Sequence, residues 1–475
     1  MIQTKNRTKI IATVGPASES YEDLLNLVNA GVNLFRFNFS HGSQEHHQKL
    51  FEHVHKINRT YKLNIGILAD LQGPKIRIGE VKGETVQLTT GQKLQITTEE
   101  VLGTSERIGI NFDNFPKDVS EGDIILFDDG KIELRILSTD NDKNVEAEVL
   151  FGGELSSKKG VNFPDTSLTL PSLTEKDIED ARFAFANNAN WVALSFVRSA
   201  DDVLALRNLL GHKHKIKIIS KIEKPEAVND IDNIIKVSDG VMIARGDLGV
   251  EVPMEKMPLI QKNLVRKCIV AAKPVIIATQ ILDSMTTQSR PTRAETNDVA
   301  NDVIDGADAL MLSGETSVGI HPVKVVSTLH KLIRYVEDQE LIYNKSLTPR
   351  EESETFLSDA ICYNACRIAE QVEANGIIGM TRSGYTAFML ASYRPHARIF
   401  IFTDNEALLN ILSLCWGVQG FYYDRFVSTD ETISDVIDIL RERRMIESGD
   451  VMINTASMPL YEQGRTNMLK ITYVD

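Results

Sequence analysis

The hydrophobic residues fall into short unbroken runs, and these runs alternate with amphipathic stretches along most of the chain. Eight runs have the length of a strand and little polar alternation, which is typical of parallel strands buried on both faces. The stretches between them carry apolar residues at helical spacing and predict helices, for example over Tyr21–Ala30. The expected strands are Lys9–Val14, Val32–Phe37, Ile65–Ala69, Trp191–Phe196, Ile216–Ile222, Gly240–Ala244, Pro274–Ala278 and Ala309–Leu312.

Strands of this kind, each followed by a helix, predict a closed (β/α)8 barrel. One connection is far longer than the others: it runs from the third strand to Ser172, where Ser172-x-x-Glu175 predicts a capped helix start. Within Lys75–Leu170 the pattern changes to short alternating runs, and Asp128-Asp129-Gly130 is a strong turn signal. We therefore expect a small all-β domain inserted at the C-terminal end of a barrel strand, where it would cover the barrel mouth as a lid.

A third unit follows the helix expected at Pro322–Asp338 and the charged connector Asn344–Glu354. It again alternates strands with helices, which predicts a separate α/β domain. The expected fold class is α/β: a (β/α)8 TIM barrel at 1–74 and 171–343, an inserted all-β lid domain at 75–170, and a C-terminal α/β domain at 344–475. The strands expected in the last domain are Gly376–Met380, Arg398–Phe402, Val451–Asn454 and Leu469–Val474.

The charge balance narrows the function classes. The 475 residues include 52 Lys and Arg against 66 Asp and Glu, a net charge of −14. That balance disfavours binding to nucleic acid or to an anionic membrane, although a few local cations can still hold a phosphorylated small molecule. No apolar run approaches the ~20 residues of a membrane-spanning helix, and Ile10–Val14 is too short for a signal peptide. The four cysteines are too few for a disulfide framework, so we expect a reducing, cytoplasmic compartment.

Polar side chains gather at the ends of the expected barrel strands, and the C-terminal rim of such a barrel is its catalytic face. Glu223 and Asp247 follow neighbouring strands and offer the oxygen ligands that Mg²⁺ or Mn²⁺ prefers, unless both form ion pairs with Lys221 and Arg245. Lys221 lies two residues from Glu223 and so points to the same side of its strand. A cation beside a metal suits phosphoryl transfer. The other strand-end residues are Arg36, Asn38, Ser40, Asp70, Thr279, Ser313 and Glu315.

Four further patterns are weaker signals. The turn Gly246–Gly249 offers backbone N–H groups to a carboxylate, but Gly-Asp pairs are ordinary turn formers. Ser40 could simply cap the helix that follows it. Lys158-Lys159-Gly160 is typical of a solvated turn, although a lid over phosphates would use such cations. The histidines at 41, 46, 47, 53 and 55 lack the spacing of a metal site.

Eight short segments match one known family in order, in spacing and in the presence of the inserted domain. They are Thr8–Ser18 (TKIIATVGPAS), Phe35–Gly42 (FRFNFSHG), Asp70–Arg77 (DLQGPKIR), Lys158–Asn162 (KKGVN), Ser220–Glu223 (SKIE), Met242–Gly249 (MIARGDLG), Ala278–Met285 (ATQILDSM) and Leu312–Thr316 (LSGET). On these segments the sequence strongly resembles pyruvate kinase over essentially its whole length.

Members of that family transfer the phosphoryl group of phosphoenolpyruvate to ADP, giving pyruvate and ATP. The resemblance implies that Glu223 and Asp247 hold the divalent metal and that Lys221 stabilises charge on the transferring group. It implies substrate binding by Arg36 at the phosphate, and by Gly246, Asp247 and Thr279 at the carboxylate. It implies nucleotide contacts for Thr13, Pro16, Arg36, His41, Arg77 and Lys159. The proton donor to the enolate stays open between Thr279 and a water chain near Ser313 and Glu315.

The resemblance also implies a monovalent-cation pocket at Asn38, Ser40 and Asp70, which K⁺ fills in many family members. Those members carry Thr-Lys-Gly-Pro-Glu where this chain has Leu71-Gln72-Gly73-Pro74-Lys75. We expect the Lys75 ammonium group beside the pocket to supply the charge of K⁺, because two cations so close would repel. K⁺ is therefore expected to be dispensable; the alternative is that Lys75 points into solvent.

A loop of the C-terminal domain is a candidate effector site. Its residues Thr381, Ser383, Gly384 and Thr386 lie between a strand and a helix start, where backbone N–H groups favour an anion. The resemblance implies a sugar phosphate or AMP as the effector and a homotetramer through which its signal travels. The alternative is an ordinary capped loop.

Two other function classes fit parts of the sequence. A metal-dependent aldolase or lyase would need a Glu/Asp pair on such a barrel, but it has no use for phosphate-facing cations in a lid. A metabolite sensor or a nucleic-acid binder would need no catalytic set, and the net charge of −14 disfavours the second.

Overall fold

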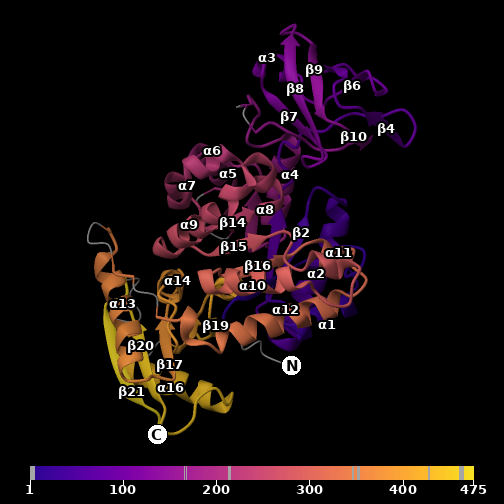
Figure 1. Cartoon of the computed structure of the whole chain (residues 1–475). Helices are drawn as coiled ribbons and strands as arrows, with labels where there is room; N and C mark the ends of the chain where they lie inside the picture. The colour runs from indigo at the N-terminus through magenta and orange to yellow at the C-terminus, as the bar shows by residue number, and fades with distance from the viewer. Residues whose placement is uncertain are drawn as a thin grey trace.

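The computed structural model describes residues 6–164, 166, 168–211, 216–344, 347–349, 353–425, 428–458 and 465–475. A central barrel carries the inserted domain at one end and the C-terminal domain at the other (Figure 1). The connector expected over residues 344–354 lies partly outside the described residues, which omit 345–346 and 350–352.

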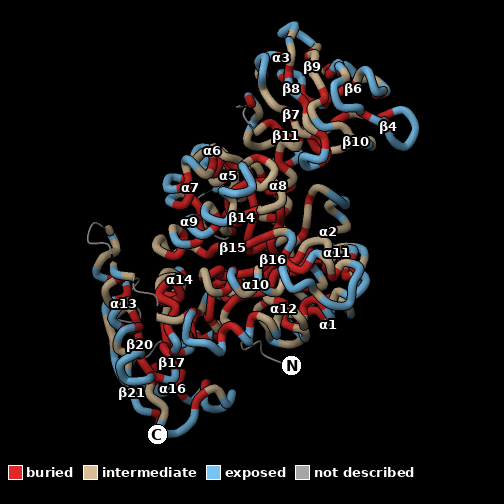
Figure 2. Tube along the Cα trace, in the orientation of Figure 1, coloured by how far each residue is buried: buried red, intermediate tan, exposed pale blue. Residues whose placement is uncertain are grey.

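Eight parallel strands close into a barrel in the order β1-β16-β15-β14-β13-β12-β3-β2. They form the buried centre of the molecule in Figure 2, because each strand packs against the barrel interior on one side and against helices on the other. All eight expected strands are confirmed to within two residues; β12 ends at Leu194 rather than Phe196, whose φ is 54°. The bounds are β1 Lys9–Thr13, β2 Leu34–Asn38, β3 Gly66–Asp70, β12 Trp191–Leu194, β13 Lys217–Ile222, β14 Gly240–Ala244, β15 Val275–Ala278 and β16 Ala309–Leu312.

Helices surround this barrel, and two of their starts differ from expectation. The N-cap of α4 is Thr174, whose side chain accepts a hydrogen bond from the Asp177 backbone N–H; the expected Ser172–Glu175 box is wrong. The reason is tertiary, since Asp177 also accepts the Gly73 N–H. Ser43, not Ser40, caps α2. The helices are α1 Tyr21–Ala30, α2 Gln44–Tyr61, α4 Glu175–Ala186, α5 Ala200–Leu210, α6 Pro225–Asn229, α7 Ile231–Val237, α8 Arg245–Glu251, α9 Met257–Val270, α10 Arg293–Asp305, α11 Gly314–Ser317 and α12 Pro322–Glu337.

The inserted domain leaves the barrel after β3 and returns before α4. These two points lie together, because the Gly73 N–H donates to Asp177 Oδ1 at 3.0 Å. Apart from the four-residue helix α3 (Phe115–Asp118), the described elements of the domain are strands, and Asp128 and Asp129 have the positive φ of the expected turn. The strands are β4 Thr85–Leu88, β5 Lys93–Thr97, β6 Arg107–Gly109, β7 Ile124–Phe127, β8 Ile132–Thr139, β9 Asn144–Phe151, β10 Gly153–Ser156 and β11 Val161–Asn162.

The C-terminal domain is a five-stranded sheet in the order β19-β18-β17-β20-β21, with only β21 antiparallel to its neighbour. Its four expected strands are confirmed, and β19 is a strand that the sequence pattern did not predict. The buried Arg394 guanidinium fixes the domain to the barrel by donating to the Gly306 carbonyl at 2.7 Å and to Asp308 at 3.1 Å. The elements are α13 Phe356–Gln371, β17 Gly376–Met380, α14 Tyr385–Ser392, β18 Arg398–Thr403, α15 Glu406–Ile411, β19 Val418–Tyr422, α16 Thr429–Glu442, β20 Val451–Ala456 and β21 Met468–Tyr473.

None of the described helices combines the length and the apolar content that crossing a membrane requires.

Candidate active site

Charged side chains from three strands meet inside the carboxyl-end rim of the barrel. Arg36 Nε on β2 donates to Asp70 Oδ2 on β3 at 2.6 Å, and Lys221 Nζ on β13 lies 3.2 Å from Asp70 Oδ1. The Arg36 Nη1 atom also donates to Thr13 Oγ1 at 3.1 Å. The parallel register carries residues far apart in sequence to the same rim. Thr13, Arg36, Asp70 and Lys221 therefore form one contiguous polar cluster.

Lys221 is held as a cation at the centre of this cluster. Its Nζ lies 3.0 Å from Glu223 Oε1 and donates to Ser195 Oγ at 2.7 Å. Burial alone would lower the pKa of Lys221, but the carboxylates of Asp70 and Glu223 outweigh it and raise that pKa above its ordinary value. For Asp70, burial alone would raise the pKa, and the charges of Lys221 and Arg36 reverse the effect and lower it.

Glu223 and Asp247 fit a divalent cation by their donor chemistry. Glu223 is only 1% exposed, and its Oε2 accepts the Phe196 N–H at 2.6 Å. Burial raises the pKa of Glu223, and the negative charge of Asp247 adds to that rise. The side chain of Asp247 is 29% exposed, and a dication held by both carboxylates would offset the repulsion between them. No group of three or more His, Cys, Asp or Glu side chains that could hold a metal occurs within the described residues, so the remaining ligands would come from substrate and water, as Mg²⁺ allows.

The rim cations do not both pair with Glu223 and Asp247, the two candidate metal ligands. Lys221 contacts Glu223, but Arg245 Nη1 turns to Asp298 at 2.6 Å. Asp247 instead faces Lys75, whose Nζ lies 3.6 Å from Asp247 Oδ1. Of the two ion pairs expected in the alternative, the one between Glu223 and Lys221 is present, whereas Arg245 does not pair with Asp247.

The position of Lys75 differs from expectation. We expected its ammonium group beside Asn38, Ser40 and Asp70, but within the described residues its ion pair is with Asp247. Lys75 follows the turn at Gly73 into the inserted domain, and its side chain extends along Gly160, where a Cβ would lie 3.5 Å from Lys75 Cε. The lysine charge thus lies at the Asp247 carboxylate and is not directed into solvent alone.

Gly246 and Thr279 lie together at the ends of β14 and β15. The Gly246 N–H donates to Thr279 Oγ1 at 2.7 Å, and Thr279 has a φ of 70°. A Cβ at position 246 would lie 3.3 Å from Thr279 Oγ1, so an alanine there would displace the Thr279 side chain by a few tenths of an ångström. Beside Asp247, the Gly246 N–H is thus already bonded to Thr279, and the Thr279 hydroxyl donates in turn to the Ala278 carbonyl at 2.6 Å.

The remaining barrel residues surround the cluster at different depths. Asn38 lies opposite Asp70 in the β2–β3 register, and its Oδ1 accepts the Ser40 N–H at 3.1 Å. Pro16 and His41 are exposed. Glu315 follows β16, the strand beside β1; it accepts the Ser313 N–H at 2.7 Å, and burial raises the pKa of Glu315.

Arg77 and Lys159, the two candidate nucleotide contacts in the inserted domain, have partners within that domain. Arg77 Nη1 donates to the Lys158 carbonyl at 3.0 Å, and Lys159 Nζ lies 2.9 Å from Asp128 Oδ1. Across the described part of the chain, no hydrogen bond or ion pair joins either side chain to the rim cluster.

The pattern-based search missed three polar groups at this rim. Ser195 orients Lys221, and the Phe196 N–H orients Glu223. Glu251 on α8 accepts from Asn162 of the lid at 2.7 Å and from Lys224 at 2.6 Å. The signal for Ser195 was available, because it directly follows a barrel strand like the residues that were selected.

The candidate effector loop forms a tight turn before α14. Gly384 has a φ of 87°, and its N–H donates to Thr381 Oγ1 at 3.1 Å. Ser383 Oγ accepts the Tyr385 N–H at 3.3 Å, and Thr386 Oγ1 lies 2.7 Å from Thr466 Oγ1. Only Thr381 and Gly384 of the four candidate residues are bonded to each other within the described part of the chain, and all three hydroxyls are already engaged.

Two family models match the chain. The model described as pyruvate kinase, barrel domain, matches residues 5–326, and the model described as pyruvate kinase, alpha/beta domain, matches residues 359–472. The pyruvate kinase of Geobacillus stearothermophilus is 43% identical over 471 residues, which cover 98% of this chain and 80% of that protein. That of Sporosarcina psychrophila is 42% identical over 468 residues, with the same two coverages.

A solved structure agrees with these relatives. The crystal structure of a pyruvate kinase from Cryptosporidium parvum superposes with a TM-score of 0.92 at 35% identity, covering 99% of this chain and 97% of that one. With both family models matched and the barrel-rim cluster in place, the chain belongs to the pyruvate kinase family.

Proposed function

We propose that the rim cluster around Lys221 is where this chain performs its reaction. As a pyruvate kinase, the chain is a phosphotransferase that converts phosphoenolpyruvate and ADP to pyruvate and ATP in the last step of glycolysis. The observation that carries the assignment of the site is the Lys221 ammonium group, held between Asp70 and Glu223 with Arg36 on the far side of Asp70.

In this proposal the side chains work by charge and position. Arg36 binds the phosphoryl group of the substrate, and Lys221 stabilises the negative charge that spreads over that group as it moves to ADP. Gly246 and Thr279 orient the substrate carboxylate. Thr13, Pro16, His41, Arg77 and Lys159 face the nucleotide once the lid closes, and closure must then exchange the Lys159–Asp128 contact for phosphate.

Metal dependence is a general property of the family, and we propose Mg²⁺ or Mn²⁺ as the ion. Glu223 and Asp247 would hold it. When bound, it supplies Lewis acidity and neutralises substrate charge. The proton that completes pyruvate comes from Thr279 or from water held near Ser313 and Glu315; both stay open.

The test replaces Lys221 with methionine. We expect kcat to fall about 10²- to 10³-fold with little change in the KM for phosphoenolpyruvate, because the lost charge acts mainly in the transition state. Lys217→Met is the matched control: it lies on the same strand at the opposite end of the barrel and should keep kcat. A near-normal kcat in Lys221→Met would remove Lys221 from the mechanism.

We propose that K⁺ is dispensable. The family resemblance implies a cation pocket at Asn38, Ser40 and Asp70, and the support for its replacement is the ammonium group of Lys75 already lying 3.6 Å from Asp247. The fixed charge would act through the metal-site carboxylate, not from within the pocket.

We propose further that residues 75–170 act as a closing lid and that residues 344–475 regulate the enzyme. The loop at Thr381, Ser383, Gly384 and Thr386 would bind a sugar phosphate or AMP, supported by its turn geometry ahead of α14. A homotetramer is supported by β21, an edge strand whose Tyr473 is 72% exposed. The bacterial relatives are glycolytic enzymes, which supports a cytoplasmic location and binding of neither nucleic acid nor membrane.

A further inference from the structure

A large cavity separates the barrel from the C-terminal domain at the end of the barrel away from the rim cluster. Its volume is about 1560 Å³, which is ample for a small molecule. The barrel contributes residues at or just before the amino ends of its strands, including Trp191, Lys217 and Lys273. Since the active-site residues lie at the carboxyl ends, this cavity is separate from the active site, although Ser383 of the candidate effector loop also lines it.

Positive charge is in excess around the cavity. Its described lining holds six Lys and Arg side chains against four Asp and Glu, although the whole chain has a net charge of −14. Several of these cations already have partners. Lys217 lies 3.2 Å from Asp239, and Lys267 lies 2.6 Å from Asp232. The excess favours an anion in the cavity.

Lys273 is the cation best placed to bind that anion. Its Nζ donates to the Ser238 carbonyl at 2.6 Å, and among the described residues it forms no ion pair. Burial lowers the pKa of Lys273, and the charge of Asp239 opposes that change. An ammonium group has three donors, so further donors remain for a ligand.

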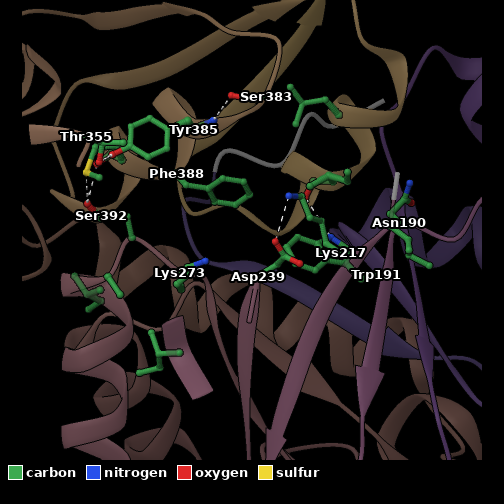
Figure 3. Close-up of a pocket in the computed structure, with 18 of the residues that line it drawn as sticks. Asn190, Trp191, Lys217, Asp239, Lys273, Thr355, Ser383, Tyr385, Phe388 and Ser392 are labelled. Atoms are coloured by element: carbon green, nitrogen blue, oxygen red, sulfur yellow. Dashed lines mark hydrogen bonds and ion pairs between the residues drawn. The ribbon is translucent and has the colours of Figure 1, made fainter. Parts of the chain in front are cut away.

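The C-terminal domain forms the opposite wall, with an apolar part from α14 and further residues from α15 and from the loop before α14, including Glu406 and Arg382. Tyr385, Phe388, Met389 and Ser392 line the cavity at helical spacing, so they share one face of the helix. Figure 3 shows Phe388 of this helix lying above Lys273 and Asp239 of the barrel. A ligand that satisfies both walls needs an anionic head and an apolar body.

We propose that this cavity binds a small organic monocarboxylate, with its head on Lys273 and its apolar body against Phe388 and Met389. A single partly buried ammonium group matches one negative charge better than the two of a phosphate. Such a ligand would contact both the barrel and α14, so its binding free energy would add to the stability of the contact between the two domains.

The test compares two probes with the same apolar body. We would titrate the full chain with 3-phenylpropionate and with its uncharged amide, following the fluorescence of tryptophan, because Trp191 lines the cavity. The acid is expected to bind saturably and about tenfold more tightly than the amide, as a charge-assisted hydrogen bond requires. Lys273→Gln should abolish that difference, while Lys236→Gln, at an exposed lining position, should keep it.

A second variant guards against misfolding of the first. Phe388→Ala leaves Lys273 in place and should weaken the acid and the amide by similar factors. Neither Lys273 nor Phe388 belongs to the rim cluster, so both variants should keep the kcat of the wild type without probe. Equal binding of acid and amide, an unchanged preference in Lys273→Gln, or no saturable binding would overturn the proposal.

Discussion

Reversing the charge of Lys75 tests the proposal that this enzyme does not need K⁺. Lys75 Nζ lies 3.6 Å from Asp247 Oδ1, and both side chains are close to one-third exposed. At that distance Coulomb's law gives roughly 1 kcal/mol in water and about 4–5 kcal/mol at an effective dielectric constant of 20. The exposure places the attraction near the lower end, about 1–2 kcal/mol.

Lys75→Glu replaces this attraction with a repulsion of similar size, so the total change is about 2–4 kcal/mol. Without K⁺ we expect kcat/KM to fall about 30- to 1,000-fold, because each 1.36 kcal/mol is a factor of ten. K⁺ should restore much of the loss by offsetting the added carboxylate. The wild type should change less than about twofold on adding K⁺, because its ammonium group already supplies the charge.

The assay follows pyruvate formation at saturating Mg²⁺ in a tetramethylammonium buffer free of sodium and potassium, with and without added KCl. Lys75→Met is the matched control, since it removes the charge without adding a repulsion. Its kcat/KM without K⁺ should lie between those of the wild type and Lys75→Glu. The reasoning is refuted if K⁺ activates the wild type many-fold, or if Lys75→Glu matches the wild type without K⁺.

Three further predictions concern positioning, stability and regulation. Ser195→Ala should lower kcat about 3- to 10-fold at unchanged KM, because Lys221 loses one hydrogen bond. Steady-state kinetics must show a larger fall in kcat for this variant than for Ser238→Ala, a control at another buried serine. Arg394→Met should lower the free energy of unfolding, measured with urea, by about 3–5 kcal/mol, because the buried Asp308 carboxylate loses its cation. A loss no larger than in the exposed control Arg398→Met would contradict this. Ser383→Glu should abolish activation by a sugar phosphate or AMP without changing basal kcat; retained activation would exclude the loop.

The barrel could be predicted from sequence because its strands are buried on both faces. Runs such as Val275–Ala278 are apolar throughout and are bounded by polar or turn residues, so local pattern and tertiary role agree. Strand β19 was missed because Val418-Gln-Gly-Phe-Tyr422 mixes polar residues and glycine, and only its pairing with β18 makes it a strand.

The site was predictable as a set of strand ends but not as a set of contacts. Strand register explains why Arg36 and Asp70 meet, whereas the partner of Lys75 depends on how the inserted domain leaves the barrel. The prediction of the α4 N-cap failed for the same reason. Ser172 and Thr174 both fit a local capping pattern. The structure uses Thr174, whose capping partner Asp177 also contacts Gly73, 104 residues away.

That contact between Gly73 and Asp177 also bears on how the chain could have been assembled in evolution. It joins the two points at which about a hundred residues of another domain leave and re-enter the barrel, so the two ends of the insertion lie side by side. Domain insertion is tolerated where the ends of the inserted unit are close. The inserted domain can therefore change in length or sequence without stretching the barrel, while Glu251 and Asp247 on α8 restrict the few positions at which the two domains touch. The amino-acid sequence should accordingly diverge fast in the outer strands of the inserted domain and slowly at Lys75 and Asn162.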